Sequence, residues 1–168
     1  MSHSFICNLM HCTFSTKDRY LWINEDLEVR LWPYIGGIAR ENRMKALAIG
    51  GVADHLHALL SLPSTMSFAK AVQLIKGGSS KWIHGELRLR KFEWQAGYGA
   101  FSVSQSPVKK TIAYINNQRN TIGREPLQKS FYNCWTNTEL IMIHVMSFGR
   151  FQSSATRTWP SLIAIAQH

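Results

Sequence analysis

The chain has 168 residues, a length that suits a single domain with its own hydrophobic core. Its formal net charge of +9 makes polyanions the expected partners, because Lys and Arg side chains attract phosphates at long range. The three cysteines lack the spacing of a zinc site, and no apolar stretch is long enough to cross a bilayer, so a disulfide scaffold, a zinc centre and a membrane-spanning protein are excluded and the cytoplasm is expected.

The first part of the chain predicts a strand followed by a helix. Residues 4–15 are rich in β-forming side chains and lead into a turn-forming segment. Residues 26–44 carry Leu, Tyr and Ile at helical spacing, which predicts a helix that Pro33 should kink. A hairpin should follow, because the extended segments 46–50 and 54–62 are joined by a glycine pair at 50–51.

The next part predicts two helices separated by strands. Residues 67–85 have an apolar face at helical spacing, with lysines on the opposite side. Segments 92–95 and 98–105 are typical of strands. A third helix is predicted over 106–119, with Ser106 as the N-cap and the following proline in the first turn. The succession of elements indicates an α+β fold, in which helices cover a small antiparallel sheet.

Basic residues are concentrated in the middle of the chain. Residues 64–110 carry eight Lys and Arg against two Glu, whereas residues 1–63 carry six basic and six acidic side chains. We therefore expect a local basic surface, which is typical of binding to nucleic acid.

Two histidines and a tyrosine are the candidate chemical groups. His55 and His57 lie two apart in a predicted strand, so both imidazoles leave the same face and can share a cation, while Leu56 packs on the other side. Tyr114 and Gln118 lie one helical turn apart and can face one site. Spacing alone also allows a hydrogen-bonded histidine pair and an ordinary half-buried tyrosine.

Four segments, in order along the chain, resemble one family: GGVADHLHALLSLP at 50–63, LIKGGSSKWI at 74–83, FEWQAGYGAFSVSQ at 92–105 and YINNQ at 114–118. They resemble the single-tyrosine HUH transposases of insertion sequences, including the REP-associated tyrosine transposases. The resemblance covers residues 1–119 and implies one transposase domain with a ferredoxin-like or RNA-recognition-like α+β fold.

The resemblance also implies a mechanism. His55 and His57 match the metal-binding histidine pair, Gln118 matches the third ligand, and Tyr114 matches the nucleophile. The metal is Mg²⁺ or Mn²⁺, and the tyrosine cuts single-stranded DNA beside hairpins at element ends and forms a 5′-phosphotyrosine bond that a 3′-hydroxyl later resolves.

The same resemblance implies partners and surroundings. The expected partners are hairpin DNA at the prokaryotic nucleoid and a second copy of the chain, whose tyrosine helix can complete the histidine site in trans. The residues expected to contact DNA are Lys70, Lys76, Lys81, Lys91, Trp94 and Tyr98, with core packing as the alternative for Trp94. Asp54 is expected to support the histidines or form a turn, whereas His3, His11 and His84 are expected at the surface or in local hydrogen bonds.

The resemblance stops after Arg119, and residues 120–168 match no part of the family. The codons of residues 120–148, chosen freely among synonyms and read one base out of frame, can encode EHHRERTFTKEFLQLLDKHGIDYDPRYVF. This string resembles the usual end of these transposases. We therefore expect that a single-base deletion near the Arg119 codon produced an atypical, poorly packed tail.

Two other functions fit parts of the sequence. A nucleic-acid-binding relative that has lost catalysis, through decay or domestication, would keep the same sheet and basic surface. An HUH replication initiator or relaxase is the second alternative, but such chains are usually larger and often carry two tyrosines or a helicase partner.

Overall fold

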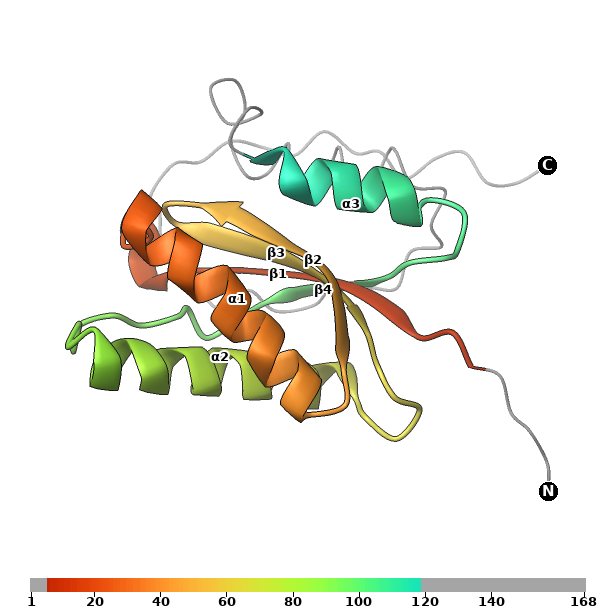
Figure 1. Cartoon of the computed structure of the whole chain (residues 1–168), viewed down its shortest axis with the longest axis horizontal. Helices are drawn as coiled ribbons and strands as arrows, with labels where there is room; N and C mark the ends of the chain where they lie inside the picture. Colours follow the sequence, from red (N-terminus) through yellow and green to blue (C-terminus); the bar gives the residue numbers. More distant parts are fainter. Residues whose placement is uncertain (1–5, 119–168) are drawn as a thin grey trace, which may run out of the picture.

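The computed structural model describes residues 6–118, which form an antiparallel sheet with helices on both of its faces (Figure 1). The strands pair in the order β2-β3-β1-β4, so β3 and β1 are central. This arrangement confirms the predicted α+β class. The elements, in chain order, are β1 (Leu9–Ser15), the short 3-10 helix η1 (Lys17–Arg19), α1 (Glu25–Glu41), β2 (Lys45–Val52), β3 (His55–Ser61), α2 (Phe68–Glu86), β4 (Gly99–Ser102) and α3 (Val108–Asn116).

The two faces of the sheet are covered by different helices. Helices α1 and α2 lie on one face and α3 lies on the other (Figure 1). Because strand side chains alternate between faces, every second residue of β1 and β3 points into the core beneath α1 and α2. That core contains, from these two strands, Met10, Cys12, Phe14, Leu56, Ala58 and Leu60.

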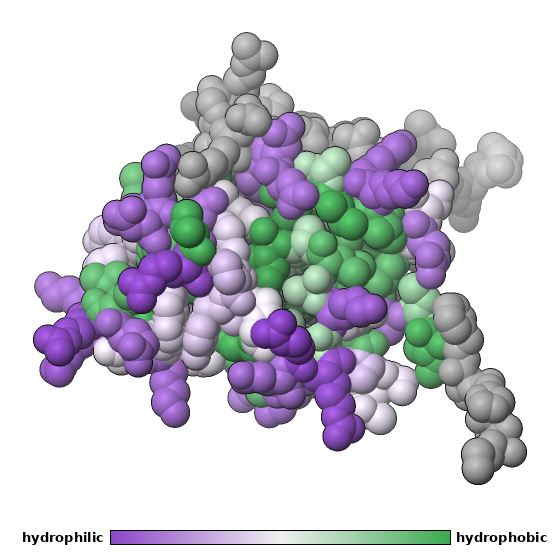
Figure 2. Space-filling model, in the orientation of Figure 1, coloured by the Kyte–Doolittle hydropathy of each residue, from purple (hydrophilic) through white to green (hydrophobic). Residues whose placement is uncertain are grey.

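Helix α3 packs through a smaller apolar cluster formed by Leu9, Ala48, Leu59, Val103 and Ile115. Figure 2 shows apolar side chains gathered around α3 and the neighbouring edge of the sheet. This cluster fixes where α3 lies on the sheet, and therefore where the side chains of α3 meet those of β1 and β3.

Most predicted elements are confirmed, with differences at their ends. Helix α1 begins after Asn24, whose side chain accepts a hydrogen bond from the Leu27 amide at 2.9 Å, and Pro33 lies inside α1 without ending it. The predicted strand at 92–95 is wrong, because this segment makes only a single bridge, between Thr16 and Trp94.

The predicted hairpin is present, but its turn lies further along the chain. Gly50 and Gly51 belong to β2, and Ala53 and Asp54 form the turn. The glycines are needed for close approach instead: a Cβ on Gly50 would collide with the backbone carbonyl of Ile115 in α3. The prediction of the hairpin is therefore confirmed, and the prediction that the glycine pair forms its connection is wrong.

The third helix is shorter than predicted. Its N-cap is Pro107, with no side-chain cap, so the assignment of Ser106 as the N-cap was wrong. The predictions for His3, for the third cysteine and for the tail at 120–168 lie outside the described residues. No helix among residues 6–118 is long and apolar enough to cross a membrane.

Candidate functional site

The face of the sheet beneath α3 carries a row of buried polar side chains. They come from alternating positions of β1 and β3: His11, Thr13, Ser15, His55 and His57. The antiparallel register places Ser15 opposite His55 and Thr13 opposite His57. Both candidate metal-binding histidines therefore leave the same face, as predicted, and Leu56 packs in the core on the other side.

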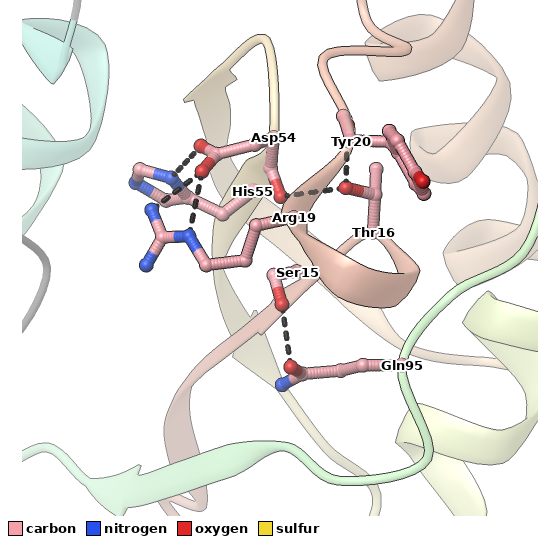
Figure 3. Close-up of polar contacts among 7 residues, drawn as sticks. All are labelled: Ser15, Thr16, Arg19, Tyr20, Asp54, His55 and Gln95. Carbon is pink, nitrogen blue, oxygen red and sulfur yellow. Dashed lines mark hydrogen bonds and ion pairs between the residues drawn. The ribbon is translucent and has the colours of Figure 1, made fainter. Parts of the chain in front are cut away.

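His55 is held by a carboxylate on the hairpin turn. Its Nδ1 lies 2.7 Å from Asp54 Oδ1, and the second carboxylate oxygen accepts from Arg19 Nε at 2.9 Å and from a terminal guanidinium nitrogen at 2.5 Å (Figure 3). Asp54 thus lies between an imidazole and a guanidinium. This confirms its predicted supporting role beside the histidine and also its place in a turn.

The backbone around Arg19 is arranged for this contact. Asp18 and Arg19 have φ angles of 53° and 56°, a left-handed conformation that costs non-glycine residues about 1–2 kcal/mol each. The Thr16 amide donates to the Asp54 carbonyl at 2.8 Å, which ties the end of β1 to the hairpin turn. The local strain is therefore offset by contacts that bring Arg19 to the carboxylate.

His57 is held by a second histidine. Its Nδ1 lies 3.0 Å from His11 Nε2, and both rings are about 1% exposed. The expectation that His11 would be a surface or locally bonded residue was wrong, because His11 lies on a central strand beneath α3. His84, in contrast, makes the expected local hydrogen bond, from its ring nitrogen to the Phe92 carbonyl at 2.6 Å.

The remaining nitrogen of each candidate ligand is available to a cation. Among residues 6–118, the Nε2 atoms of His55 and His57 are buried and have no hydrogen-bond partner. Unpaired buried polar atoms are uncommon, and a pair on neighbouring imidazoles is the donor arrangement that a divalent metal accepts. Among residues 6–118, no group of three His, Cys, Asp or Glu side chains could hold a metal, so a third ligand from this part of the chain would be of another type.

Tyr114 lies beside two of the buried histidines, His57 and His11. Its ring centroid is 5.5 Å from that of His57 and 6.2 Å from that of His11, in edge-on geometry, and all three belong to the same chain. Gln118 is buried two residues beyond the end of α3, and its amide nitrogen donates to the Tyr114 carbonyl at 3.2 Å. The sheet and α3 therefore bring the ring of Tyr114 next to His57 and His11, with Gln118 just beyond the end of the same helix.

Burial keeps His11 and His57 uncharged. It lowers the pKa of His11 from 6.5 to about 4 and lowers the pKa of His57 well below the ordinary value, with nearby imidazoles adding to the effect on His57. For Asp54, burial acts to raise the pKa, but hydrogen bonds from His55 and Arg19 outweigh it and lower the pKa. Near neutral pH His11 and His57 are thus neutral, and the carboxylate of Asp54 is ionised and paired.

Two residues expected to contact DNA make contacts within the protein. Trp94 is 9% exposed, packs edge-on against Phe14 and Phe92 with centroids 4.9 Å apart, and donates to Ser79 at 2.9 Å, so its ring belongs to the core. Lys76 is half-buried and donates to the carbonyls of residues 95–97, and burial lowers its pKa. Both line an open hollow of about 370 Å³ beside α2.

The other residues predicted to contact DNA differ in exposure. Lys70, Lys81 and Lys91 are exposed, and Tyr98 is partly buried against the larger core. The first two lie on α2, which covers the face of the sheet opposite α3 (Figure 1). On the α3 side, Lys109 and Lys110 are exposed.

His11 and Arg19 are the residues at this site that sequence reasoning missed. His11 shares its face with His57, but the contact depends on the pairing of β1 with β3, which the sequence pattern does not fix. Arg19 reaches Asp54 through a left-handed turn that contains no glycine, so the sequence does not indicate the turn. The only available signal was that residues 9, 11, 13 and 15 alternate with an apolar set, which places a histidine on the less apolar face.

Comparison with known proteins gives a consistent result. The family model described as "Transposase IS200 like" matches residues 6–118. Among solved structures, a candidate transposase from Deinococcus radiodurans R1 is similar at 20% identity and a TM-score of 0.56, covering 70% of this chain and 96% of that one. A REP-associated tyrosine transposase bound to a REP hairpin is similar at 16% identity and a TM-score of 0.52, covering 72% and 73%. No curated protein matches the chain.

Proposed function

Because the chain belongs to the IS200-like transposase family, we propose that it cuts and rejoins single-stranded DNA, with Tyr114 as the nucleophile and a divalent metal ion held by His55, His57 and Gln118. The observation that carries this proposal is the contact between Tyr114 and His57, whose ring centroids are 5.5 Å apart within one chain. A phenol beside a cation-accepting imidazole pair is what phosphodiester transfer by tyrosine requires.

The chemistry conserves the energy of the cleaved bond. The phenolic oxygen of Tyr114 attacks the scissile phosphorus, a tyrosyl–phosphate bond forms, and the bond from phosphorus to the 3′ oxygen breaks. The proton lost by the phenol is balanced by the proton gained by the departing 3′-hydroxyl. Attack by another 3′-hydroxyl on the phosphotyrosine reverses these changes and rejoins the DNA, so no nucleotide hydrolysis is needed.

The protein residues fit a bound divalent ion. Two buried Nε2 atoms without partners would provide nitrogen ligands, and the Gln118 amide would provide an oxygen, which leaves room for water or phosphate oxygens. Bound Mg²⁺ or Mn²⁺ would polarise the scissile phosphate and neutralise charge on it. The carboxylate of Asp54 holds the ring of His55 in place from behind.

The proposed DNA partner is a hairpin with a single-stranded flank. One structural neighbour is bound to a REP hairpin, and the chain has a net charge of +9, both of which support this substrate class. We also propose a homodimer. Tyr114 already meets His57 within one chain, so completion of the site by a partner would need α3 to move to the other subunit.

The test is formation of a covalent adduct between the protein and a labelled hairpin oligonucleotide in the presence of Mg²⁺ or Mn²⁺. The wild-type chain should form an adduct that survives denaturation, and Tyr114→Phe should abolish it while leaving DNA binding within a few-fold. Tyr34→Phe is the matched control, since Tyr34 lies on α1, stacks on Trp82 and has no place in the site. DNA binding without any adduct would instead support the catalytically decayed binding module.

A further inference from the structure

His11 has no role in the chemistry just proposed, yet it touches one of its ligands. Its ring is buried, and Nε2 lies 3.0 Å from Nδ1 of His57. The two residues are not directly opposite each other: the strand register sets His11 opposite Leu59 and Thr13 opposite His57. The imidazoles therefore meet along a diagonal between β1 and β3, a distance that long side chains can span.

The geometry of this contact limits where protons can be. Two ring nitrogens at 3.0 Å share one proton, because two N–H groups would clash and two lone pairs would repel. If His57 carries the proton on Nδ1, its Nε2 keeps a lone pair for a cation. If His11 carries it instead, a neutral His57 must hold its proton on Nε2, which is then closed to a metal.

We propose that His11 is a positioning residue that accepts a hydrogen bond from Nδ1–H of His57 and thereby fixes both the ring orientation and the tautomer that presents Nε2 to the site. The identity of what Nε2 binds rests on the proposed function, whereas the tautomer does not. His55 is oriented in a parallel way by Asp54, so each ligand ring has its own anchor.

The difference between the two anchors suits an anionic substrate. Asp54 carries a negative charge, but Arg19 pairs with it at 2.5 Å. His11 is an uncharged acceptor, so it orients His57 without placing a second negative charge beside a DNA phosphate. His11 does not serve as a ligand through Nε2, because that atom faces His57.

The tautomer can be measured on the full-length, metal-free protein. With the histidine nitrogens isotopically labelled, long-range proton–nitrogen correlation spectra distinguish a ring protonated on Nδ1 from one protonated on Nε2. We expect His57 to be protonated on Nδ1, with Nε2 bare. Protonation of His57 on Nε2 in the wild-type protein would overturn the proposal, and this measurement needs no variant that could fail to fold.

Variants then test the cause. His11→Leu removes the acceptor, so His57 should shift toward the Nε2-protonated form and the Mn²⁺ affinity should fall about 10–100-fold. His11→Gln keeps an oxygen acceptor near the same place and should restore affinity to within a few-fold. His84→Leu is the matched control, because His84 lies on α2 and bonds only to the Phe92 carbonyl in the described contacts. A folded His11→Leu protein with an unchanged His57 tautomer and Mn²⁺ affinity would contradict the proposal.

The outcomes separate this inference from the proposed function. If His57 has the expected tautomer, sensitive to His11, but wild-type protein binds no Mn²⁺, then the positioning role stands and the metal part of the proposed function fails. If wild-type protein binds Mn²⁺ and forms the adduct, and the tautomer of His57 is unchanged in His11→Leu, only the positioning role fails.

Discussion

The two faces of the sheet are built from the same strands but differ in the side chains that they bury. Beneath α1 and α2, alternating residues of β1 and β3 are apolar and fully buried, as Phe14 and Leu56 illustrate. Beneath α3, the intervening residues are mostly polar, equally buried, and joined by specific contacts such as that between His11 and His57. Burying imidazoles beneath α3 costs free energy, because buried polar groups lose their contacts with water. The apolar side chains buried beneath α1 and α2 offset this cost.

This difference predicts that substitutions on adjacent residues of one strand will have unequal effects. Phe14→Ala removes a fully buried ring from the large core and should lower the free energy of unfolding by about 3–5 kcal/mol. Thr13→Ala, one residue away on the other face, should cost about 1 kcal/mol or less. Denaturant unfolding of both variants measures the contrast. Equal losses would show that the two faces do not divide these roles.

The second-largest effect should be a loss of stability at acid pH, caused by protonation of the polar face. Burial holds the pKa of His11 near 4 in the folded chain, whereas the unfolded residue titrates near its ordinary 6.5. The folded pKa is depressed, so the unfolded state binds more protons at intermediate pH, and stability that is complete above about pH 6.5 is lost as the pH falls toward 4. The shift corresponds to about 3 kcal/mol.

The check is denaturant unfolding of metal-free protein across this pH range. His57 and Asp54, whose pKa values are also lowered, should steepen the loss at the acid end. Replacing His11 by Leu should shrink the dependence. A free energy of unfolding that stays constant from pH 7 to about 4 would contradict the assignment of neutral, buried imidazoles.

The contrast between faces also explains what the sequence could predict. Apolar periodicity is a dense signal, so the helices and the histidine strand were predicted with small errors at their ends. The link between Tyr114 and His57 came from the family resemblance, because periodicity cannot place a helix on a particular strand. The contacts of His11 and Arg19 were missed because one depends on strand register and the other on a strained turn. For Trp94 the structure shows the core-packing alternative, which the sequence could not separate from base stacking because an aromatic side chain suits either role.

The position of α3 over the polar face can be tested at one glycine. A Cβ on Gly50 would collide with the Ile115 carbonyl, so Gly50→Ala should push α3 away from β2. We expect a loss of about 1–3 kcal/mol in the free energy of unfolding and a weaker covalent adduct, since Tyr114 is next to Ile115.

Gly37→Ala is the matched control. Gly37 lies in α1, where a Cβ would meet nothing within 4 Å, and alanine is the better helix former, so this change should stabilise the chain by about 0.5–1 kcal/mol. If Gly50→Ala left both stability and adduct yield unchanged, α3 would not be docked as closely as the structure shows.

The smallest expected effect concerns the lysines of α2, which lie on the face away from Tyr114. Lys70 and Lys81 are exposed, and we predict that they bind hairpin phosphates while the single-stranded flank reaches the opposite face. The double change to Ala should make affinity less sensitive to salt: the magnitude of the slope of log affinity against log salt should fall by about 1–2, about one for each lost phosphate contact. The adduct yield at saturating DNA should not change. Lys76→Met should instead lower the stability and leave the salt slope unchanged, because Lys76 donates hydrogen bonds to the carbonyls of the loop before β4. A salt slope insensitive to Lys70 and Lys81 would mean that the DNA stays on the α3 side, where Lys109 and Lys110 are the exposed cations to change next.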